Sequence, residues 1–478
     1  MYHGASYREP LLIERGEFHT HKPLKIVPKS LQPTKSVKLP TFDETQIVRH
    51  FFHLSQMNYG IDTGMYPLGS CTMKYNPKIC EQISRWECFS QTHPHQDEST
   101  IQGNLQILYE LERMLCEITG MQHFTLQPAA GAQGEFTGLL LTRAYHESRQ
   151  ESHRKVVILP DTSHGTNPAS VTMAGYSVVE IPSTSEGTVD LDILEKTLSE
   201  DTACFMITNP NTLGIFESDI AAIAKAVHQS GALLYYDGAN MNAILGKTRP
   251  GDMGFDIVHL NLHKTFSTPH GGGGPGAGPI GVTDRLAAFL PIPRVIKQHK
   301  TYHFNYDYPQ SIGKIKQYYG NFSVLLKAYI YILLMGRDGL EEIADVAVLN
   351  ANYMKKKLVD SGLYSLPYRE LRKHEFVLSC EQLLQEKGVR ALDVAKRLLD
   401  YGLHPPTVYF PLIVKEALMI EPTESESQQM LDSYIDALLA IAQENPELLH
   451  HAPHHTSVHR IDEARAIKDQ IFRWQDVK

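Results

Sequence analysis

The sequence predicts an α/β protein with a large domain on a parallel or mixed sheet and a smaller C-terminal α+β domain. Two observations predict this architecture. From Phe124 to about Val282, short apolar runs alternate with helical patterns, as in a parallel sheet covered by helices. After the glycine run at 271–278, long helical patterns such as Ile343–Asp360 take over. The chain has 478 residues, which is enough for two or three domains.

Composition and charge narrow the classes of function. Hydrophobic residues make up 42% of the chain and charged residues 21%, as in folded globular proteins. Lys plus Arg is 45 against 54 for Asp plus Glu, a net charge of −9, so we expect no nucleic-acid partner and no membrane partner. The apolar run Ala328–Met335 is far shorter than the ~20 residues of a membrane helix, and it predicts a buried helix.

The cysteines and the N-terminus indicate a cytoplasmic protein. The six cysteines form no C-x-x-C pair, so we expect no metal site and a reducing compartment. The first twenty residues lack the apolar stretch of a signal peptide. Residues 1–45 are rich in proline and lysine and predict an extended arm that lies along a neighbouring surface. The apolar residues of this arm are Leu24, Ile26, Val27, Leu31, Val37 and Leu39.

The expected domains are residues 1–100 (arm and helical segment), 101–330 (large domain) and 331–478 (C-terminal domain). In the large domain, the pattern at 219–231 predicts a crossover helix, with Asp219 in its first turn and Gly231 beyond its end. The predicted strands are 156–160, 204–208, 232–237 and 257–262.

The strongest chemical signal is an aspartate and a lysine that end neighbouring apolar runs. Asp237 ends one run, and Lys264 follows the next, 264 − 237 = 27 positions later. Open α/β sheets bind ligands at the carboxyl ends of their strands. A lysine there can form a Schiff base with an aldehyde, and an aspartate can pair with a pyridinium nitrogen. Pyridoxal phosphate (PLP) needs both groups, although either residue alone is more often structural.

Three further segments fit this cofactor. The small residues of PAAGAQGE precede a helical run, so the backbone N–H groups of Gly131, Ala132 and Gln133 are candidates for holding a phosphate. His164 follows a predicted strand and could stack on a pyridine ring, although a lone histidine is more often structural. The run HGGGGPGAGP at 270–279 matches G-x-G-x-x-G only formally, and it predicts a tight backbone passage beside Lys264.

Seven stretches spread over most of the chain resemble one family, the P proteins of the glycine cleavage system (decarboxylating glycine dehydrogenases). Because several of these stretches reach eight or more residues in one order, chance similarity is excluded. The stretches are YPLGSCTMKYNP (66–77), QPAAGAQGE (127–135), SHGTNPAS (163–170), TNPNTLGIFE (208–217), NLHKTFSTPHGGGGPGAGP (261–279), LNANYM (349–354) and MIEPTESES (419–427).

The resemblance implies a PLP-dependent enzyme of fold type I, the aspartate-aminotransferase-like fold. It implies that Lys264 is the Schiff-base lysine, Asp237 pairs with the ring nitrogen and His164 stacks on the ring, with Ala239 and Asn240 close by. The phosphate would lie on Gly131, Ala132 and Gln133, with His263 or Thr208. Substrate-side candidates are Tyr66, Ser70 and Thr72.

The activity that the resemblance implies is decarboxylation of glycine, with transfer of the aminomethyl group to the lipoyl disulfide of the H protein. In many organisms the enzyme of this family is a single polypeptide of roughly twice this length, with the cofactor lysine in its C-terminal half. The chain therefore resembles the separate second subunit of the split bacterial form. The implied partners are the first subunit in an α2β2 heterotetramer, the lipoylated H protein, and the T and L proteins of the system.

Departures from the family pattern and other functions stay open. Lys314 and Lys327 stand where the split form usually has arginine, so we assign neither to the substrate carboxylate. Cys71 is either a redox-sensitive thiol or, more consistent with its type, a buried small residue. The alternatives are another PLP enzyme, such as an amino-acid decarboxylase or a β-eliminating lyase, and a non-catalytic structural subunit, against which Lys264 counts.

Overall fold

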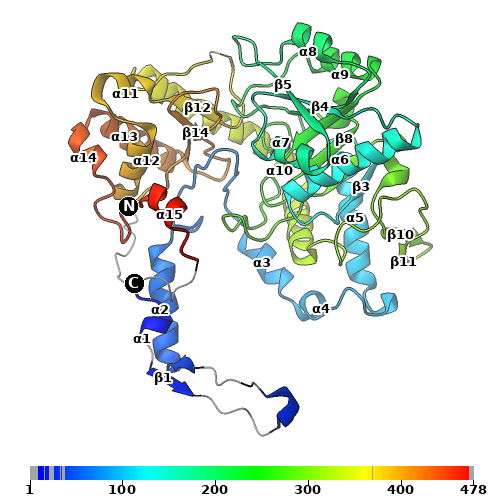
Figure 1. The fold of residues 1–478 in the computed structure, drawn as a ribbon, viewed down its shortest axis with the longest axis horizontal. Helices are drawn as coiled ribbons and strands as arrows, with labels where there is room; N and C mark the ends of the chain where they lie inside the picture. The colour runs from blue at the N-terminus through cyan, green and yellow to red at the C-terminus, as the bar shows by residue number, and fades with distance from the viewer. Residues whose placement is uncertain are drawn as a thin grey trace.

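A computed structural model describes residues 9–15, 17–20, 26–32, 34, 38–368 and 370–472 (Figure 1). The chain forms a large lobe, a smaller C-terminal lobe and an N-terminal arm that projects away from both. Leu24 and Val37 of the predicted arm lie outside the described residues.

The large lobe is built on a seven-stranded mixed sheet in the order β3-β9-β8-β7-β6-β4-β5. Neighbours from β8 to β5 are parallel, whereas β9 is antiparallel to both β3 and β8. The predicted mixed sheet and all four predicted strands are therefore confirmed. The strands are β3 His123–Thr125, β4 Val156–Pro160, β5 Ser177–Ile181, β6 Thr202–Thr208, β7 Leu233–Gly238, β8 Ile257–Leu260 and β9 Ile280–Val282.

The register of these strands aligns their carboxyl ends. Thr208 at the end of β6 lies opposite Asp237 of β7, and Asp237 lies opposite His259 of β8. The polar side chains that end these apolar strands therefore meet at one edge of the sheet.

Helices cover both faces of the sheet, and two clusters of buried apolar side chains lie between the helices and the sheet. The predicted crossover is α9, which Asp219 directly precedes and which Gly231 follows with a φ of 82°. On α6, a Cβ at Gly138 would lie 2.2 Å from the ring of Tyr235, so glycine lets this helix approach the sheet. The helices are α5 Gln102–Thr119, α6 Gly131–Ser148, α7 Thr166–Met173, α8 Leu191–Thr197 and α9 Ile220–Gln229.

The long helix α10, Phe322–Asp360, joins the two lobes. It bends at Gly336, whose φ of 60° and ψ of −169° are not helical. The helix predicted at 343–360 is its second half. The predicted buried run at 328–335 is only partly buried, because Leu333 and Leu334 are 55% and 46% exposed.

The C-terminal lobe packs helices on a three-stranded antiparallel sheet in the order β12-β14-β13, which is the predicted α+β arrangement. Its strands are β12 Phe376–Ser379, β13 Thr407–Val408 and β14 Ala417–Ile420. Its helices are α11 Glu381–Lys387, α12 Ala391–Asp400, α13 Gln428–Gln443, α14 Pro446–His450 and α15 Glu463–Asp469.

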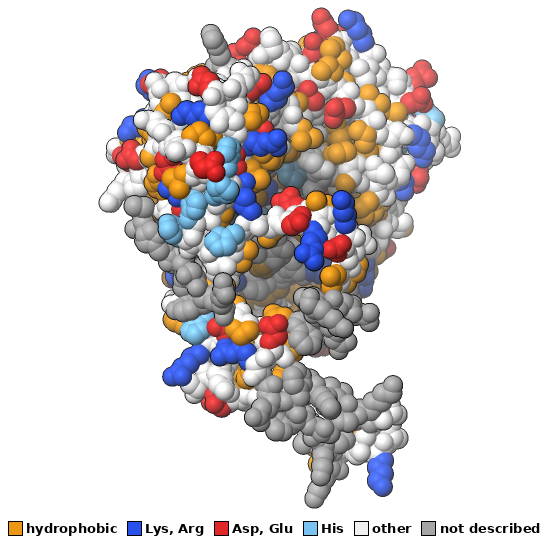
Figure 2. Space-filling view, turned by 60° about the vertical axis from the view of Figure 1, so that its left-hand side comes forward, with side chains coloured by type: hydrophobic (Ala, Val, Ile, Leu, Met, Phe, Trp, Pro, Cys, Tyr) orange, Lys and Arg blue, Asp and Glu red, His pale blue; other side chains and the backbone are white. Residues whose placement is uncertain are grey.

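The N-terminal arm contains an antiparallel hairpin of β1 and β2, which the sequence did not indicate, followed by helix α2. Figures 1 and 2 show the arm standing away from the body. Val48, Phe51 and Phe52 of α2 are exposed. The elements of the arm are α1 Leu12–Arg15, β1 Glu17–Thr20, β2 Lys38–Thr41 and α2 Glu44–Met57. The short helices α3 Lys78–Ser84 and α4 Glu87–Ser90 follow and lead the chain to the large lobe. Elsewhere in the chain, β10 Arg294–Gln298 and β11 Thr301–Asn305 form a separate antiparallel pair.

Within the described parts of the chain, no helix combines the length and apolarity required to cross a membrane.

Candidate active site

A cavity of about 230 Å³ lies at the carboxyl ends of β6, β7 and β8. Most residues predicted from the sequence line it, although they come from positions as far apart as 70 and 264. The predicted residues in its lining are Ser70, Gly131, Ala132, His164, Thr208, Asp237, Ala239, Asn240, His263 and Lys264. Of the predicted set, Gln133, Tyr66 and Thr72 lie outside this lining.

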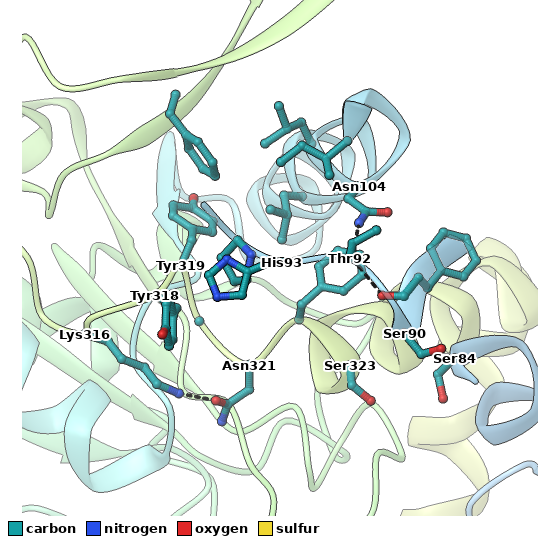
Figure 3. A pocket seen from close by; sticks show the side chains of 18 of the residues that line it. Ser84, Ser90, Thr92, His93, Asn104, Lys316, Tyr318, Tyr319, Asn321 and Ser323 are labelled. Carbon is teal, nitrogen blue, oxygen red and sulfur yellow. Dashed lines mark hydrogen bonds between the residues drawn. The ribbon is translucent and has the colours of Figure 1, made fainter. Parts of the chain in front are cut away.

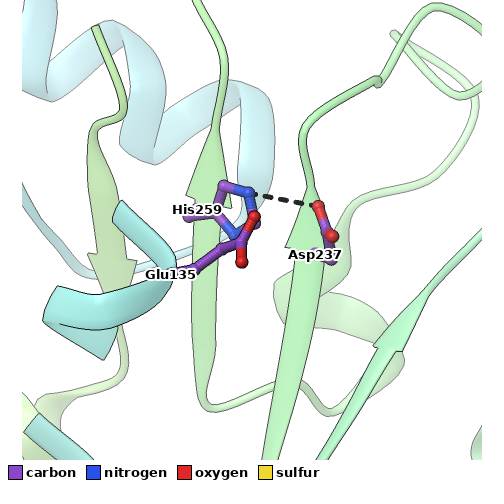
Figure 4. Close-up of side chains that lie close together, drawn as sticks. All are labelled: Glu135, Asp237 and His259. Atoms are coloured by element: carbon purple, nitrogen blue, oxygen red, sulfur yellow. Dashed lines mark ion pairs between the residues drawn. The ribbon is translucent and has the colours of Figure 1, made fainter. Parts of the chain in front are cut away.

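Asp237 is buried at the end of β7 and held from several sides. Asn167 on α7 donates a hydrogen bond to Asp237 Oδ2 at 2.9 Å. The N–H of Ala239 donates to Oδ1 at 3.1 Å. Nε2 of His259, one strand away, lies 3.1 Å from the same oxygen as an ion pair (Figure 4). The carboxylate therefore has one fixed orientation.

The charges of Asp237 and His259 stabilise each other. Burial alone would raise the pKa of Asp237, but the positive charge of His259 and the hydrogen bonds around the carboxylate hold that pKa below its usual range. Burial likewise would lower the pKa of His259, yet the Asp237 carboxylate raises it. Each group thus favours the charged form of the other, and Asp237 keeps the negative charge that a pyridinium nitrogen requires.

His164 lies in the loop between β4 and α7 and lines the cavity. Its Nδ1 is 2.9 Å from Thr166 Oγ1, which donates to Glu135 Oε1 at 2.6 Å. Burial, reinforced by the charge of Lys264, lowers the pKa of His164. The ring is therefore a neutral, oriented imidazole.

Lys264 is buried and donates from Nζ to the carbonyl oxygen of Ser70 at 2.6 Å. Two histidines stand near it. Burial and the charge of Lys264 lower the pKa of His263 to about 3 and that of His270 to about 4. Lys264 is therefore next to neutral rings.

The turn at the start of α6 fits a phosphate. The first helical N–H with a partner in the helix is that of Gly134, on the Ala130 carbonyl at 2.9 Å, so the three preceding N–H groups remain donors. Thr208 Oγ1 at the end of β6 is buried without a hydrogen-bond partner among the described residues. A Cβ at Gly131 would lie 2.4 Å from Asn261 Oδ1, so a larger residue there would displace Asn261 or the turn. These groups match the phosphate of PLP.

The side chain of Gln133 has a structural use in this turn. Its Oε1 accepts from the Ala129 N–H at 2.6 Å, and its Nε2 donates to the Ile315 carbonyl at 3.1 Å. Only the backbone N–H of Gln133 remains available for the phosphate, as predicted for it. The glycine run makes a close backbone contact at the phosphate turn, since a Cβ at Gly278 would lie 2.1 Å from the Ala130 carbonyl oxygen.

Tyr66 and Thr72 line a neighbouring cavity of about 800 Å³, which shares His263 and His270 with the first. Tyr66 stacks on His404, with ring centroids 3.6 Å apart. These two predicted residues therefore lie on the approach to Lys264 and not against it.

A third cavity, of about 610 Å³, contains none of the predicted residues (Figure 3). His93, Lys316 and Tyr318 line it. At its edge Asn321 donates from Nδ2 to the carbonyls of Ala129 and Gly276. This cavity therefore backs onto the segment that leads into the phosphate turn.

Lys314 and Lys327, which depart from the family pattern, lie away from the cavity, and the cysteine left open by the sequence has an unreactive thiol. Lys327 pairs with Glu81 at 2.6 Å, and Lys314 lies over the ring of Tyr306; neither lines the 230 Å³ cavity. Cys71 does line it, but burial raises the pKa of its thiol. A thiol that stays protonated is a weak nucleophile.

Several residues of the site were missed by the sequence analysis. Glu135, Asn167, His259 and Asn261 lie inside or just before stretches already singled out, and their place at strand and helix ends is the signal that could have found them. His374 and Glu375 line the cavity from the C-terminal lobe, and no sequence pattern marks them.

Comparison with known proteins gives two family matches. The family described as "Glycine cleavage system P-protein" matches residues 20–308, and "Glycine dehydrogenase, C-terminal domain" matches residues 343–460. Relatives named "Probable glycine dehydrogenase (decarboxylating) subunit 2" are 56% identical in Pyrococcus horikoshii, covering 100% of this chain and 98% of theirs, and 57% identical in Thermosipho melanesiensis, covering 94% and 93%.

Solved structures agree on the fold. One is similar at a TM-score of 0.71 with 19% identity, over 87% of this chain and 93% of its own, and is titled "Crystal structure of glycine decarboxylase (P-protein) of the glycine cleavage system, in inhibitor-bound form". Glutamate decarboxylase of Lactobacillus brevis follows at a TM-score of 0.66 with 15% identity, over 88% and 98%. These likenesses confirm the predicted fold type I, and with the family matches over most of its length, the chain belongs to the glycine cleavage system P-protein family.

Proposed function

We propose that this chain is a PLP-dependent enzyme that decarboxylates glycine and transfers the remaining aminomethyl group to the lipoyl disulfide of an H protein. One observation carries the proposal: Lys264, the ionised Asp237 and a turn of free N–H groups surround one buried cavity. Membership of the P-protein family selects glycine among the substrates that such a cavity could take.

Each residue has a physical task. When bound, PLP supplies an aldehyde for an amine and a ring that accepts the electron pair released with CO₂. Asp237 keeps a fixed negative charge where that ring nitrogen would lie, and His259 keeps Asp237 ionised. His164 would offer a neutral face to the ring, and Ala239 and Asn240 would lie close to it. Lys264 would hold the aldehyde of PLP covalently through its side-chain amine.

The phosphate would be held by the N–H groups of Gly131, Ala132 and Gln133 and by the free hydroxyl of Thr208. His263 is less suited to this task, because its low pKa leaves it uncharged. On the substrate side, Ser70 borders Lys264, and Tyr66 and Thr72 line the larger cavity through which a long lipoyl arm could approach.

The names of the relatives, as subunit 2, support a partner subunit 1. Exposed apolar side chains on the arm and on α10, such as Phe51, Phe52 and Leu333, offer it a surface. The same proposal includes an α2β2 tetramer, the H, T and L proteins as partners and a cytoplasmic location. It also includes the domain limits 1–100, 101–330 and 331–478. The bacterial source that the resemblance to the split bacterial form implies is not confirmed, since relatives such as those of Pyrococcus and Thermococcus are archaeal.

The experiment is exchange of labelled bicarbonate into glycine, measured with this chain alone and with partners added. We expect weak or no exchange from the chain with lipoylated H protein, and restored exchange when subunit 1 is added. Full exchange without subunit 1 would contradict the partner requirement. The rival, another PLP decarboxylase or lyase, predicts turnover of a different amino acid without H protein, and a structural subunit predicts no visible absorbance from bound cofactor.

A further inference from the structure

Two buried glutamates of the C-terminal lobe face each other beside the active-site cavity. Phe376 of β12 pairs with Ile420 of β14 in an antiparallel register, so Glu375 and Glu421 extend this pair at the same end. Both side chains are buried, and one atom each of His374, Glu375 and Glu421 lies within 4.8 Å of the others. Like charges placed directly opposite each other in a buried pair repel strongly.

The pair holds the loop that carries Ser70. Leu68 bridges to Ile420, which docks the loop on the edge of β14. The N–H of Ser70 donates to Glu375 Oε2 at 2.9 Å. Thr72 donates its N–H to Glu421 Oε2 at 3.1 Å and its hydroxyl to Oε1 at 2.8 Å. A segment near the N-terminus is thereby fastened to the C-terminal lobe.

The same loop touches Lys264 from its other side. The Ser70 carbonyl accepts the hydrogen bond from Lys264 Nζ at 2.6 Å, so one residue connects Glu375 with the lysine. Ser70 has a φ of 68° and Thr72 a φ of 50°, a left-handed conformation that is unfavourable for residues other than glycine. The hydrogen bonds to the two glutamates stabilise this conformation. Asn240, two residues after β7, donates a hydrogen bond from Nδ2 to Glu421 Oε1 at 2.7 Å.

The charges around the pair favour a single proton on it. Burial, together with the charge of Glu421, raises the pKa of Glu375 well above its usual value, and burial raises that of Glu421 to about 7. Lys264 is the cation that faces them and opposes both shifts. Cys71 is held protonated, and burial lowers the pKa of His374 to about 3, so neither neutralises a second negative charge.

We propose that Glu375 and Glu421 share one proton and, in that singly protonated form, clamp the Ser70–Thr72 loop over Lys264. They are positioning residues that act through Ser70 on the lysine. This inference deepens the proposed function, since it rests on Lys264 being the residue that anchors the cofactor. When the shared proton is lost at higher pH, two adjacent carboxylates repel and the clamp loosens.

A bound cation is the alternative to a shared proton. Neither ring nitrogen of His374 has a hydrogen-bond partner among the described residues, so a divalent cation could find three ligand atoms here. The ammonium group of Lys264 disfavours a second cation nearby. A proton bound to a carboxylate, in contrast, removes one negative charge and leaves no separate positive charge near Lys264. The observations therefore favour the proton.

The test compares Glu421→Gln with Glu217→Gln in the full chain. Gln has the shape of a protonated glutamate but cannot titrate. Glu217 is a matched control, because it is buried, has a pKa raised to about 7 by burial, and lies outside the cavity lining. In the chain without cofactor, infrared difference spectroscopy reports protonated carboxyl groups as a function of pH. In the loaded chain, the pH dependence of visible absorbance reports the environment of Lys264.

We expect the wild-type absorbance to change as pH rises through about 7, Glu421→Gln to abolish this change, and Glu217→Gln to retain it. Glu421→Gln should also remove one protonated-carboxyl band. An unchanged absorbance transition in both Glu421→Gln and Glu375→Gln would overturn the inference. One equivalent of tightly bound Zn²⁺ that both variants lose would also overturn it. Absence of any covalent attachment at Lys264 in the wild type would instead overturn the proposed function.

Discussion

The two walls of the active-site cavity hold their charged groups by different means. On the sheet wall, Asp237 and His259 are neighbours in a parallel register and neutralise each other as an ion pair. On the C-terminal wall, Glu375 and Glu421 are neighbours in an antiparallel register and would carry like charges if both were ionised. On the first wall the two opposite charges stabilise each other, whereas on the second a shared proton prevents the repulsion of two carboxylates. One site therefore contains a fixed charge and a titrating one.

The largest effect should come from Lys264, which lies between the two walls. Lys264→Ala removes the amine that anchors the cofactor, and we expect loss of bicarbonate exchange by roughly 10³-fold or more. Borohydride reduction followed by peptide mapping should label Lys264 in the wild type and no lysine in the variant. Circular dichroism checks that the variant is folded. Labelling of a different lysine would contradict this role.

A smaller effect tests the fixed charge of the sheet wall. Asp237→Asn keeps the shape and removes the charge, so we expect exchange to fall about 10²–10³-fold while the affinity for PLP changes much less. His259→Gln removes only the group that keeps Asp237 ionised, and exchange should fall about 10–100-fold. The measurements are exchange rates and PLP titration. Wild-type exchange in Asp237→Asn would show that the charge has no part in the reaction.

The sheet wall was largely predictable from sequence and the C-terminal wall was not. Apolar runs that end in Thr208, Asp237 and Lys264 identify carboxyl ends of strands, and parallel order brings such ends together. His259 was missed because it sits one position before the end of an apolar run and looks like a core residue.

The contacts of the C-terminal wall depend on long-range registers. Ser70 meets Glu375 across 305 positions, and Thr72 meets Glu421 across 349. No periodicity in the sequence specifies that β12 and β14 pair so that two glutamates coincide. The resemblance placed Glu421 inside a family stretch but assigned it no task.

A smaller effect still is expected at the phosphate turn, which belongs to the sheet wall. In Gly131→Ala, the new Cβ would lie 2.4 Å from Asn261 Oδ1, so either the turn or Asn261 must move. Overpacking of this kind costs about 1–3 kcal/mol, and we expect the affinity for PLP to fall about tenfold or more. Gly103→Ala on α5 is the matched control, since its Cβ meets nothing within 4 Å. Equal affinities in the two variants would contradict a role for the turn.

The smallest effect is on the free energy of unfolding. It tests whether burial alone raises the pKa of a carboxyl group, at Glu217, which has no part in the clamp. Glu217 accepts from the Val189 N–H with both oxygens, at 3.2 and 3.1 Å, and burial raises its pKa from 4.5 to about 7. Between these values the unfolded chain has lost the proton and the folded chain still holds it, so the stability contributed by the protonated form is lost as pH rises from 4.5 through 7. The difference of about 2.5 pKa units corresponds to about 3 kcal/mol. Denaturant unfolding of Glu217→Gln should therefore show a weaker decline in the free energy of unfolding over this window than the wild type, with the absorbance of bound PLP unchanged. A decline as steep as in the wild type would mean that Glu217 is ionised in the folded chain, and the clamp at Glu421 would then lose its matched control.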